Sequence, residues 1–313
     1  MKSLVIGGNG FIGTNLVDAL LLQGHEVRVY DRYPSRFREP NKEVEYVVGD
    51  LGNHGAVQEV VEGIDFVFHL ASTSLPHTSN EDPIYDIRTN LVDTVQLLQS
   101  CTSAAVSKIV FVSSGGTVYG VPQESPIKET HTTDPVCSYG ITKLAIEKYL
   151  QLFYHLHGLD YVVARVSNPY GEQQNPNAKQ GAVTVFLGNV KGGQPITIWG
   201  TGEVVRDYIY IGDTVKALVC AAQCALAKNE PRVFNVGAGR GYSLNQLIDA
   251  IKDVVQKPVE VRYTEGRPED VPANVLDISR AKQYLNWQPE ISLNEGLTRT
   301  WSWLQGLQLA QLS

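Results

Sequence analysis

The sequence lacks the features that mark membrane, secreted and repetitive proteins. No run of 18 apolar residues occurs among its 313 residues, so no transmembrane helix is expected. The chain opens on an apolar strand pattern, SLVIGG, and not on the charged and then apolar segments of a signal peptide. It contains no internal repeat and no low-complexity segment. These absences favour an ordinary globular protein.

Charge and cysteine patterns exclude further classes of protein. The net charge is −7 and the basic residues form no block, which argues against nucleic acid or an anionic membrane as a partner. Four cysteines are scattered without a CxxC pair: Cys101, Cys137, Cys220 and Cys224. The last two lie in the apolar segment ALVCAAQCALA and are expected to fill core space. We expect reduced thiols, no metal site and a cytoplasmic location.

Two patterns alternate through the first half of the chain. Helical periodicity covers residues 11–24, 53–62, 85–105 and 139–157. Between these segments lie short apolar runs: SLVIG, EVRVYD, VEYVVGD, DFVFHLA, KIVFVSS and DYVVARVS. Strands that are apolar throughout and separated by helices predict a parallel sheet covered on both faces. With right-handed crossovers, this is an α/β fold with a doubly wound parallel sheet of the Rossmann type.

The pattern changes at residue 168. A polar segment rich in glycine, proline and asparagine, SNPYGEQQNPNAKQG, precedes a mixture of short strands and helices. We therefore expect a Rossmann domain over residues 1–168. A smaller C-terminal substrate-binding lobe should cover residues 169–313 and interleave with the first domain.

A glycine-rich turn, GGNGFIG, follows the first strand directly. Gly7, Gly10 and Gly13 permit a tight turn and let a pyrophosphate approach the N–H groups of the next helix. A purely structural turn would show the same letters. The strand before it, the helix after it and an acid at the end of the second strand nevertheless predict dinucleotide binding.

That acid is Asp31, placed to accept hydrogen bonds from the adenosine ribose. A carboxylate there repels a 2′-phosphate, so NAD is the expected cofactor. Arg32 and Arg36 lie nearby and leave NADP as the alternative. Asp50 and Leu51 end the third strand and are candidates for contact with the adenine.

A second motif, CSYGITK, places Tyr139 and Lys143 four residues apart. Alone, such a pair is common on helix surfaces, where residues i and i+4 are neighbours. The chain also contains, in order, FHLAS, RTNLVDT, SSGGTVYG, RVSNPYG, VRDYIYIGD and RPEDVPANVLDISRAKQYLNW. With these motifs it resembles the extended short-chain dehydrogenase/reductase family over nearly its whole length. Within that family it is similar to the NAD-dependent nucleotide-sugar epimerases of the UDP-glucose 4-epimerase type.

The resemblance gives Tyr139 and Lys143 catalytic roles. Tyr139 would take a proton from a sugar hydroxyl, and Lys143 would also hold the nicotinamide ribose. A free phenol has a pKa near 10, which the Lys143 ammonium and the oxidised nicotinamide would lower. Many relatives bind the reacting oxygen with the third residue of a Ser-Ser-Ser motif. That residue is Gly115 here, so either Ser114, which is preferred, or Thr117 must supply the hydroxyl, or the phenol acts with less help.

The resemblance also completes the sets of binding residues. Asn90 is expected to brace the sheet near the cofactor. The residues expected to bind the cofactor are Gly7, Gly10, Phe11, Ile12, Gly13, Asp31, Asp50, Leu51, Leu70, Ala71, Asn90, Tyr139 and Lys143. Those expected to bind the sugar nucleotide are Asn168, Thr197, Trp199, Arg206, Arg267, Asp270 and Asn274. The two arginines suit a diphosphate, since a guanidinium binds phosphate through two parallel bonds. Trp199 is equally a candidate core residue.

The expected activity is 4-epimerisation of a UDP-hexose through a transient 4-keto intermediate. Members restricted to glucose and galactose carry a tyrosine at the position of Asn274, which walls the C2 side of the sugar. The smaller Asn274 leaves room for an N-acetyl group, so UDP-GlcNAc and UDP-GalNAc are candidate substrates beside UDP-glucose and UDP-galactose.

Three alternatives are weighed against this activity. A UDP-glucuronate 4-epimerase or decarboxylase would need a cationic or polar pocket at C6, which the sequence does not resolve. A 4,6-dehydratase needs an Asp-Glu pair where this chain has Gly116 and Thr117. A non-catalytic dinucleotide-binding regulator is opposed by the retention of Tyr139 and Lys143. The resemblance further implies a homodimer, paired through apolar outer faces of the helices that hold Asn90 and Tyr139.

Overall fold

The computed structural model describes residues 1–178, 180–266 and 271–307. Its main sheet has seven parallel strands in the order β10-β6-β5-β4-β1-β2-β3, which confirms the predicted doubly wound fold. The six apolar runs form β1 (Lys2–Ile6), β2 (Glu26–Asp31), β3 (Val44–Val48), β4 (Phe66–His69), β5 (Lys108–Ser114) and β6 (Asp160–Val166). The edge strand β10 (Val233–Val236) comes from the C-terminal half of the chain.

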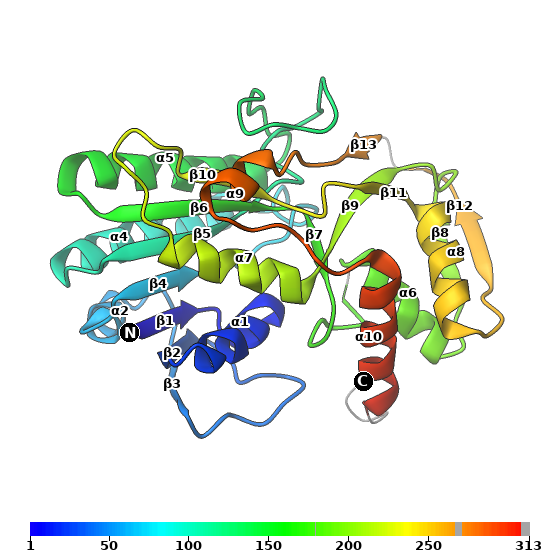
Figure 1. Ribbon diagram of the computed structural model, residues 1–313, viewed down its shortest axis with the longest axis horizontal. Helices are drawn as coiled ribbons and strands as arrows, with labels where there is room; N and C mark the ends of the chain where they lie inside the picture. The colour runs from blue at the N-terminus through cyan, green and yellow to red at the C-terminus, as the bar shows by residue number, and fades with distance from the viewer. Residues whose placement is uncertain (179, 267–270, 308–313) are drawn as a thin grey trace.

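Helices cover both faces of this sheet (Figure 1). One face carries α1 (Phe11–Leu22) and α7 (Ile211–Gln223), which pack against each other. The other carries α2 (His54–Val61), α4 (Asp93–Ser103) and α5 (Ser138–His157). Along β1, Val5 packs in the core on the side of α1 and α7. Leu4 and Ile6 pack in the core on the side of α2, α4 and α5, as the two-residue period of a strand requires. The uniformly apolar strands are explained by this burial on both sides.

The segment expected as one helix over residues 85–105 is divided in three. It forms α3 (Pro83–Asp86), the π-helical turn η1 (Ile87–Val92) and α4. Its apolar periodicity continues through the turn, so the sequence pattern did not reveal it. A π-helical turn widens the spacing of the backbone hydrogen bonds and frequently occurs at a functional site. Asn90 lies on this turn.

The second lobe is built on β9 (Val205–Tyr210), which lies at the centre of a small sheet with β7 (Asn168–Tyr170), β11 (Gly241–Ser243) and β13 (Ala273–Asn274). A separate pair is formed by β8 (Ile196–Trp199) and β12 (Val261–Thr264). Beside these strands lie α6 (Ala182–Lys191), α8 (Leu244–Val255) and α10 (Leu293–Gly306), whereas α9 (Ser279–Tyr284) packs against β10 of the main sheet. In Figure 1, α6, α8 and α10 gather at the right, beyond the main sheet.

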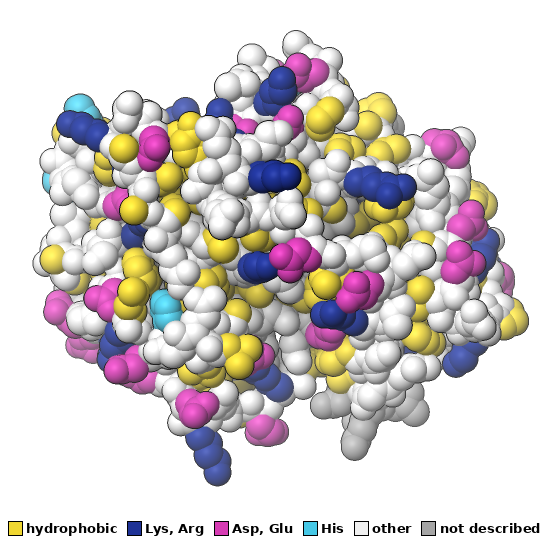
Figure 2. Space-filling view, viewed as in Figure 1, with side chains coloured by type: hydrophobic (Ala, Val, Ile, Leu, Met, Phe, Trp, Pro, Cys, Tyr) yellow, Lys and Arg dark blue, Asp and Glu magenta, His cyan; other side chains and the backbone are white. Residues whose placement is uncertain are grey.

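Two surface properties follow from the described residues. None of their helices combines the length and apolar character needed to cross a membrane. On the face shown in Figure 2, basic and acidic side chains are interspersed, and no basic patch dominates it. A polyanion would therefore find no continuous binding track on this face.

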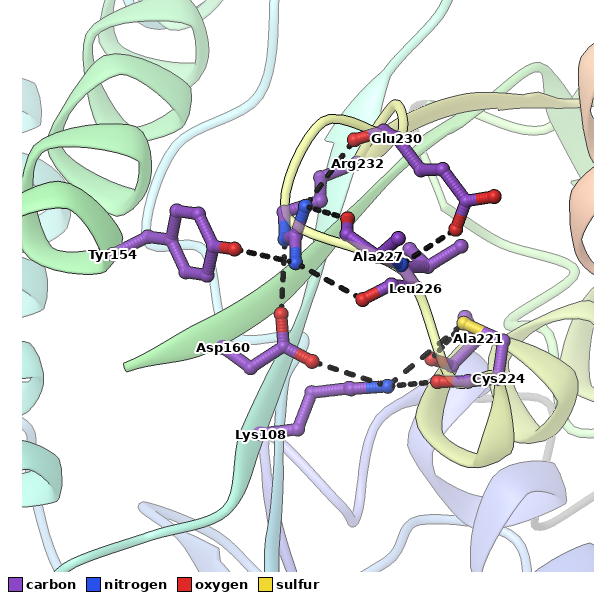
Figure 3. A network of polar contacts seen from close by, with 9 residues as sticks. All are labelled: Lys108, Tyr154, Asp160, Ala221, Cys224, Leu226, Ala227, Glu230 and Arg232. Atoms are coloured by element: carbon purple, nitrogen blue, oxygen red, sulfur yellow. Dashed lines mark hydrogen bonds and ion pairs between the residues drawn. The ribbon is translucent and has the colours of Figure 1, made fainter. Parts of the chain in front are cut away.

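A buried polar cluster ties the beginnings of β5 and β6 to the segment that follows α7 (Figure 3). Asp160 accepts a hydrogen bond from Arg232 Nε at 2.9 Å, and its other oxygen lies 3.4 Å from Lys108 Nζ. The Arg232 guanidinium lies 4.0 Å from the ring centre of Tyr154. It also donates to carbonyls after α7, and Lys108 donates to the carbonyl of Cys224. Cys224 is the C-terminal cap of α7, and its carbonyl offsets the charge of Lys108, because the C-terminal end of a helix carries partial negative charge.

Replacing Arg232 should destabilise the fold without touching the carboxyl edge of the sheet. Arg232→Ala leaves the Asp160 carboxylate without its principal partner, and we expect the free energy of unfolding to fall by about 3 kcal/mol. Chemical denaturation followed by circular dichroism measures the change. In the matched control Lys252→Ala, which breaks an exposed pair with Asp249, the loss should stay below about 0.5 kcal/mol. Equal losses in the two variants would contradict the assignment.

Candidate active site

The glycine-rich turn packs directly against the carboxyl ends of two strands. Gly7 has a φ of 81°, and a Cβ on it would lie 2.9 Å from the backbone nitrogen of Ala71. A Cβ on Gly13 would lie 2.3 Å from the carbonyl oxygen of Gly7. Gly10 precedes α1 as a cap without a side-chain hydrogen bond. The first N–H groups of α1 therefore follow a turn that is mostly glycine, which suits the pyrophosphate of a dinucleotide.

A cavity of about 180 Å³ opens at this turn. Its lining combines the turn with the segments that follow β2 and β7: Asn9, Gly10, Phe11, Thr14, Ser35, Arg36, Phe37, Gln173 and Asn175. Asn15 Nδ2 holds the second segment in place by donating to the Glu172 carbonyl at 3.0 Å. The buried Oε1 of Gln173 has no hydrogen-bond partner. Sequence analysis missed Ser35 and Gln173, because residues in irregular segments show no periodicity that would single them out.

The acid at the end of β2 is fixed beside the turn. Asp31 accepts hydrogen bonds from the N–H groups of Asn9 at 2.9 Å and Tyr33 at 3.3 Å. Arg32 forms a 2.6 Å ion pair with Asp50. Because this carboxylate already neutralises Arg32, the arrangement favours NAD over NADP. Asp50 and the buried Leu51 lie beside β2, where Tyr30 also donates to the Asp50 carbonyl.

Asn90 ties η1 to the segment that follows β4. Its Oδ1 accepts from the N–H of Thr73 at 3.0 Å, and its Nδ2 donates to Thr73 Oγ1 at 2.9 Å. Leu70 and Ala71 lie between this segment and the glycine turn, with the N–H of Leu70 bonded to Ile6. The side chain of Asn90 thus braces the segment at the carboxyl end of β4.

Helix α5 brings Tyr139 and Lys143 together. The N–H of Tyr139 donates to Ser79 Oγ at 3.0 Å, which anchors the first turn of the helix. Lys143 Nζ donates to the carbonyl of Val112 on β5 at 3.1 Å and lies 5.5 Å from the ring centre of Tyr139. The ammonium is therefore inside the protein, between the helix and the sheet.

The electrostatics of this pair differ in part from the expectation. Burial raises the pKa of the Tyr139 phenol, and the nearby Cys137 and Asp86 add to the effect. Burial also lowers the pKa of Lys143 to about 8, although Asp86 and Glu147 act in the opposite direction. The expected lowering of the phenol pKa relied on two cations, Lys143 and an oxidised nicotinamide. Lys143 by itself does not overcome the desolvation of the phenol.

The two candidate hydroxyls at the end of β5 belong to residues that are both half-buried. Thr117 Oγ1 is buried and has no hydrogen-bond partner, so it has bonding capacity to spare. Ser114 is half-buried. A Cβ at Gly115 would lie 2.6 Å from Leu276 Cδ1, so the serine found in many relatives would require the Leu276 side chain to move.

Asn274 lies against the same loop. Its Nδ2 donates to the Gly115 carbonyl at 3.1 Å, while its buried Oδ1 has no hydrogen-bond partner. Strand pairing places Asn274 opposite Arg206, and Asn168 opposite Tyr208, on neighbouring strands of the second lobe. Three of the residues expected to bind the sugar nucleotide are therefore brought together on β7, β9 and β13.

The other predicted substrate residues lie on β8 or outside the described part of the chain, and Arg206 makes a further contact. Thr197 and Trp199 lie on β8, and Trp199 is 46% exposed, so it is not a core residue. Arg206 donates to the Val271 carbonyl at 2.6 Å and is no simple solvated surface charge. Arg267 and Asp270 lie outside the described residues.

Comparisons with known proteins agree with this geometry. A family model described as the NAD dependent epimerase/dehydratase family matches residues 3–237. The chain is 35% identical to the UDP-glucose 4-epimerase of Mycolicibacterium smegmatis, over 96% of this chain and 97% of the relative. A Thermotoga maritima UDP-glucose 4-epimerase solved with UDP-glucose is 34% identical, with a TM-score of 0.92 over 97% of this chain and 99% of that one. A UDP-N-acetylglucosamine 4-epimerase from Methanobrevibacter ruminantium, solved with UDP-N-acetylmuramic acid, is 30% identical, with a TM-score of 0.90 over 97% and 98%.

Proposed function

The chain belongs to the NAD-dependent epimerase/dehydratase family, and we propose that it interconverts UDP-hexoses that differ in configuration at C4. The observation that carries this proposal is the placement of Tyr139 and Lys143 against the end of β5, two strands from the glycine turn that follows β1. Carboxyl ends of neighbouring parallel strands form one edge, so the dinucleotide and the phenol share one site. Similarity to UDP-sugar 4-epimerases supports the reaction class.

Each residue of the site has a defined task in this reaction. Tyr139 takes the proton of the C4 hydroxyl, and the Lys143 ammonium stabilises the phenolate that performs this step. Thr117 holds the same oxygen with its unpartnered hydroxyl. When bound, NAD supplies reversible acceptance of the C4 hydride, so no net reduction accompanies the reaction. Gly7, Gly10 and Gly13 would hold its pyrophosphate, and Asp31 its ribose.

The second lobe holds the nucleotide end of the substrate. Arg206 is the described guanidinium nearest to Asn274 in strand register and suits the diphosphate. Asn168 is positioned on the adjoining strand, where its Nδ2 donates to the Asp207 carbonyl at 3.0 Å. Inversion requires the 4-keto sugar to present its other face to the cofactor, and a substrate anchored through its diphosphate can rotate in this way.

The four cysteines form no disulfide, consistent with the cytoplasmic location that we propose.

An assay for exchange without net redox change tests the function. Purified protein supplied with NAD+ and UDP-galactose should produce UDP-glucose, and with UDP-GalNAc it should produce UDP-GlcNAc. NMR of the sugar H4 signal measures the conversion. The same equilibrium should be reached from either side, with no lasting absorbance of NADH. Stoichiometric NADH or loss of CO₂ would contradict epimerisation and favour a dehydrogenase or decarboxylase.

Matched variants assign the tasks within this assay. Tyr139→Phe removes the proton acceptor, and kcat should fall by about 10²–10⁴-fold. Thr117→Val keeps the shape of the side chain but removes its hydroxyl, with an expected loss of about 10–100-fold. Ser114→Ala should keep activity within about threefold, since its hydroxyl is not assigned to the reacting oxygen. If Ser114→Ala lost more activity than Thr117→Val, the role would belong to Ser114.

We further propose that the site accepts an N-acetyl group at C2 of the sugar. The buried Asn274 Oδ1 lacks a hydrogen-bond partner and could accept from the acetamido N–H. Asn274→Tyr should therefore lower kcat/KM for UDP-GlcNAc and UDP-GalNAc by at least about tenfold relative to the unacetylated pair. The control Asn274→Ser keeps the space open and should retain turnover of the acetylated pair. An equal response of both sugar pairs to the tyrosine would refute the role.

An apolar face on α5 supports the homodimer that the family resemblance implies. Ile141, Tyr149, Leu152 and Leu156 are exposed along one side of the helix. Ile84, Ile87 and Val92 are exposed on the neighbouring α3 and η1. Sedimentation at micromolar concentration should give the mass of two chains, and Leu152→Glu should shift it toward one. A wild-type protein that sediments as a single chain would contradict the dimer.

A further inference from the structure

A fully buried carboxylate lies behind the proposed catalytic pair. Asp86, the last residue of α3, is 0% exposed. Its Oδ1 accepts from Ser74 Oγ and from Asn90 Nδ2 at 3.0 Å. Its Oδ2 accepts from Ser138 Oγ at 2.8 Å and Thr142 Oγ1 at 2.7 Å. All four hydrogen bonds come from side chains, so the residue joins separate segments of the chain and does not merely cap its own helix.

The donors are placed around the reaction site. Ser138 and Thr142 immediately precede Tyr139 and Lys143 on α5. Asn90 lies on the π-helical turn, and Ser74 in the segment that follows β4. Through these bonds, Asp86 sets the register of the first two turns of α5 against the segment that Asn90 braces.

The charges around Lys143 leave Asp86 with a second task. The titratable and charged groups that interact with Lys143, with Tyr139 or with their immediate partners are Asp86, Cys137, Glu147, His69 and Arg165. Glu147 is neutralised by a 2.6 Å ion pair with Arg165. His69 is uncharged at neutral pH, because burial lowers its pKa to about 3. Among the described residues, Asp86 is therefore the carboxylate near Lys143 that forms no ion pair of its own.

We propose that Asp86 is a positioning residue of this active site, which holds the start of α5 in register and supplies the negative charge that balances the Lys143 ammonium. The catalytic part of this inference rests on the proposed function, whereas the electrostatic effect of Asp86 on Lys143 does not depend on it. Asp86 accepts from Asn90, one of the expected cofactor-binding residues, but contacts neither the glycine turn nor a residue assigned to the sugar nucleotide. It acts through Tyr139 and Lys143.

The effect of removing the Asp86 charge follows from the direction in which it shifts the pKa values of Lys143 and Tyr139. Burial lowers the pKa of Lys143 to about 8, and the carboxylate of Asp86 acts upward on it. The same carboxylate raises the pKa of Tyr139. Removing the negative charge should therefore lower both pKa values. Lys143 would then lose its proton at a lower pH. As the pH rises, activity that depends on the ammonium would therefore begin to fall at a lower pH than in the wild type.

The direct test is the titration of Lys143 in the chain without substrate. Protein carrying [13Cε]lysine is titrated by NMR, and the Lys143 signal is assigned by its loss in Lys143→Arg. In Asp86→Asn the midpoint should fall by about one pH unit. Asparagine has nearly the same shape, and the hydroxyls of Ser138 and Thr142 can accept from its amide, so the fold should persist. Asp86→Ser provides a second uncharged variant, and an unchanged midpoint in either would overturn the proposal.

Two controls separate charge from general disturbance. Asp213→Asn removes another buried carboxylate, which accepts from the N–H of Ile291 in the other lobe at 2.9 Å, and should leave the Lys143 midpoint in place. Asp86→Glu keeps the charge and should restore the midpoint to near the wild-type value. A midpoint shifted equally by Asp213→Asn would also overturn the proposal.

The pH profile of epimerisation provides the functional readout. In Asp86→Asn the alkaline limb of kcat should move to lower pH by the same amount as the Lys143 midpoint. A uniform loss at every pH would show a structural role only and would refute the charge-balancing role. If no UDP-hexose is epimerised but the Lys143 midpoint shifts as expected, the proposed function fails while the electrostatic relation holds.

Discussion

The buried inner face of α5 is the constraint on which the rest of the structure depends. It carries a phenol, an ammonium and a carboxylate at four-residue intervals: Tyr139, Lys143 and Glu147. Moving charged groups out of water costs several kcal/mol for each ion unless partners replace the lost hydration. Val112 provides its carbonyl to Lys143, and Arg165 pairs with Glu147. An apolar face would pack against β5 and β6 at lower cost, so this arrangement is explained by chemistry better than by stability.

The strand order makes that helix useful. β1, β4 and β5 are neighbours in the sheet, so the glycine turn, the segment braced by Asn90 and the loop with Thr117 follow adjacent carboxyl ends. Gly7 permits the backbone of the turn to approach Ala71 closely. A cofactor on this turn therefore lies at the same edge of the sheet as Tyr139 and Lys143.

Much of this arrangement could be predicted from the sequence, and the failures have physical causes. The six strands and the helices between them follow from apolar periods of 2 and 3.6 residues, because each is packed against the sheet core. The π-helical turn was missed because one widened turn barely changes the helical period. The segments around Ser35 and Gln173 are polar and irregular, so the cavity they line was not foreseen. Ser114 and Thr117 could not be separated, since the burial of a hydroxyl depends on residues far along the chain.

Residues far along the chain pack against the loop that contains Thr117. Leu276 occupies the space that a side chain at position 115 would need, and Asn274, two residues earlier, bonds the Gly115 carbonyl. The loop that presents Thr117 is thus held by the same strand segment that faces C2 of the proposed sugar. A serine at position 115 would require Leu276 to retreat, and Leu276 belongs to a small buried cluster with Val118, Tyr119 and Ile127. A side chain at position 115 would therefore displace Leu276 and disturb the packing of the segment that carries Asn274.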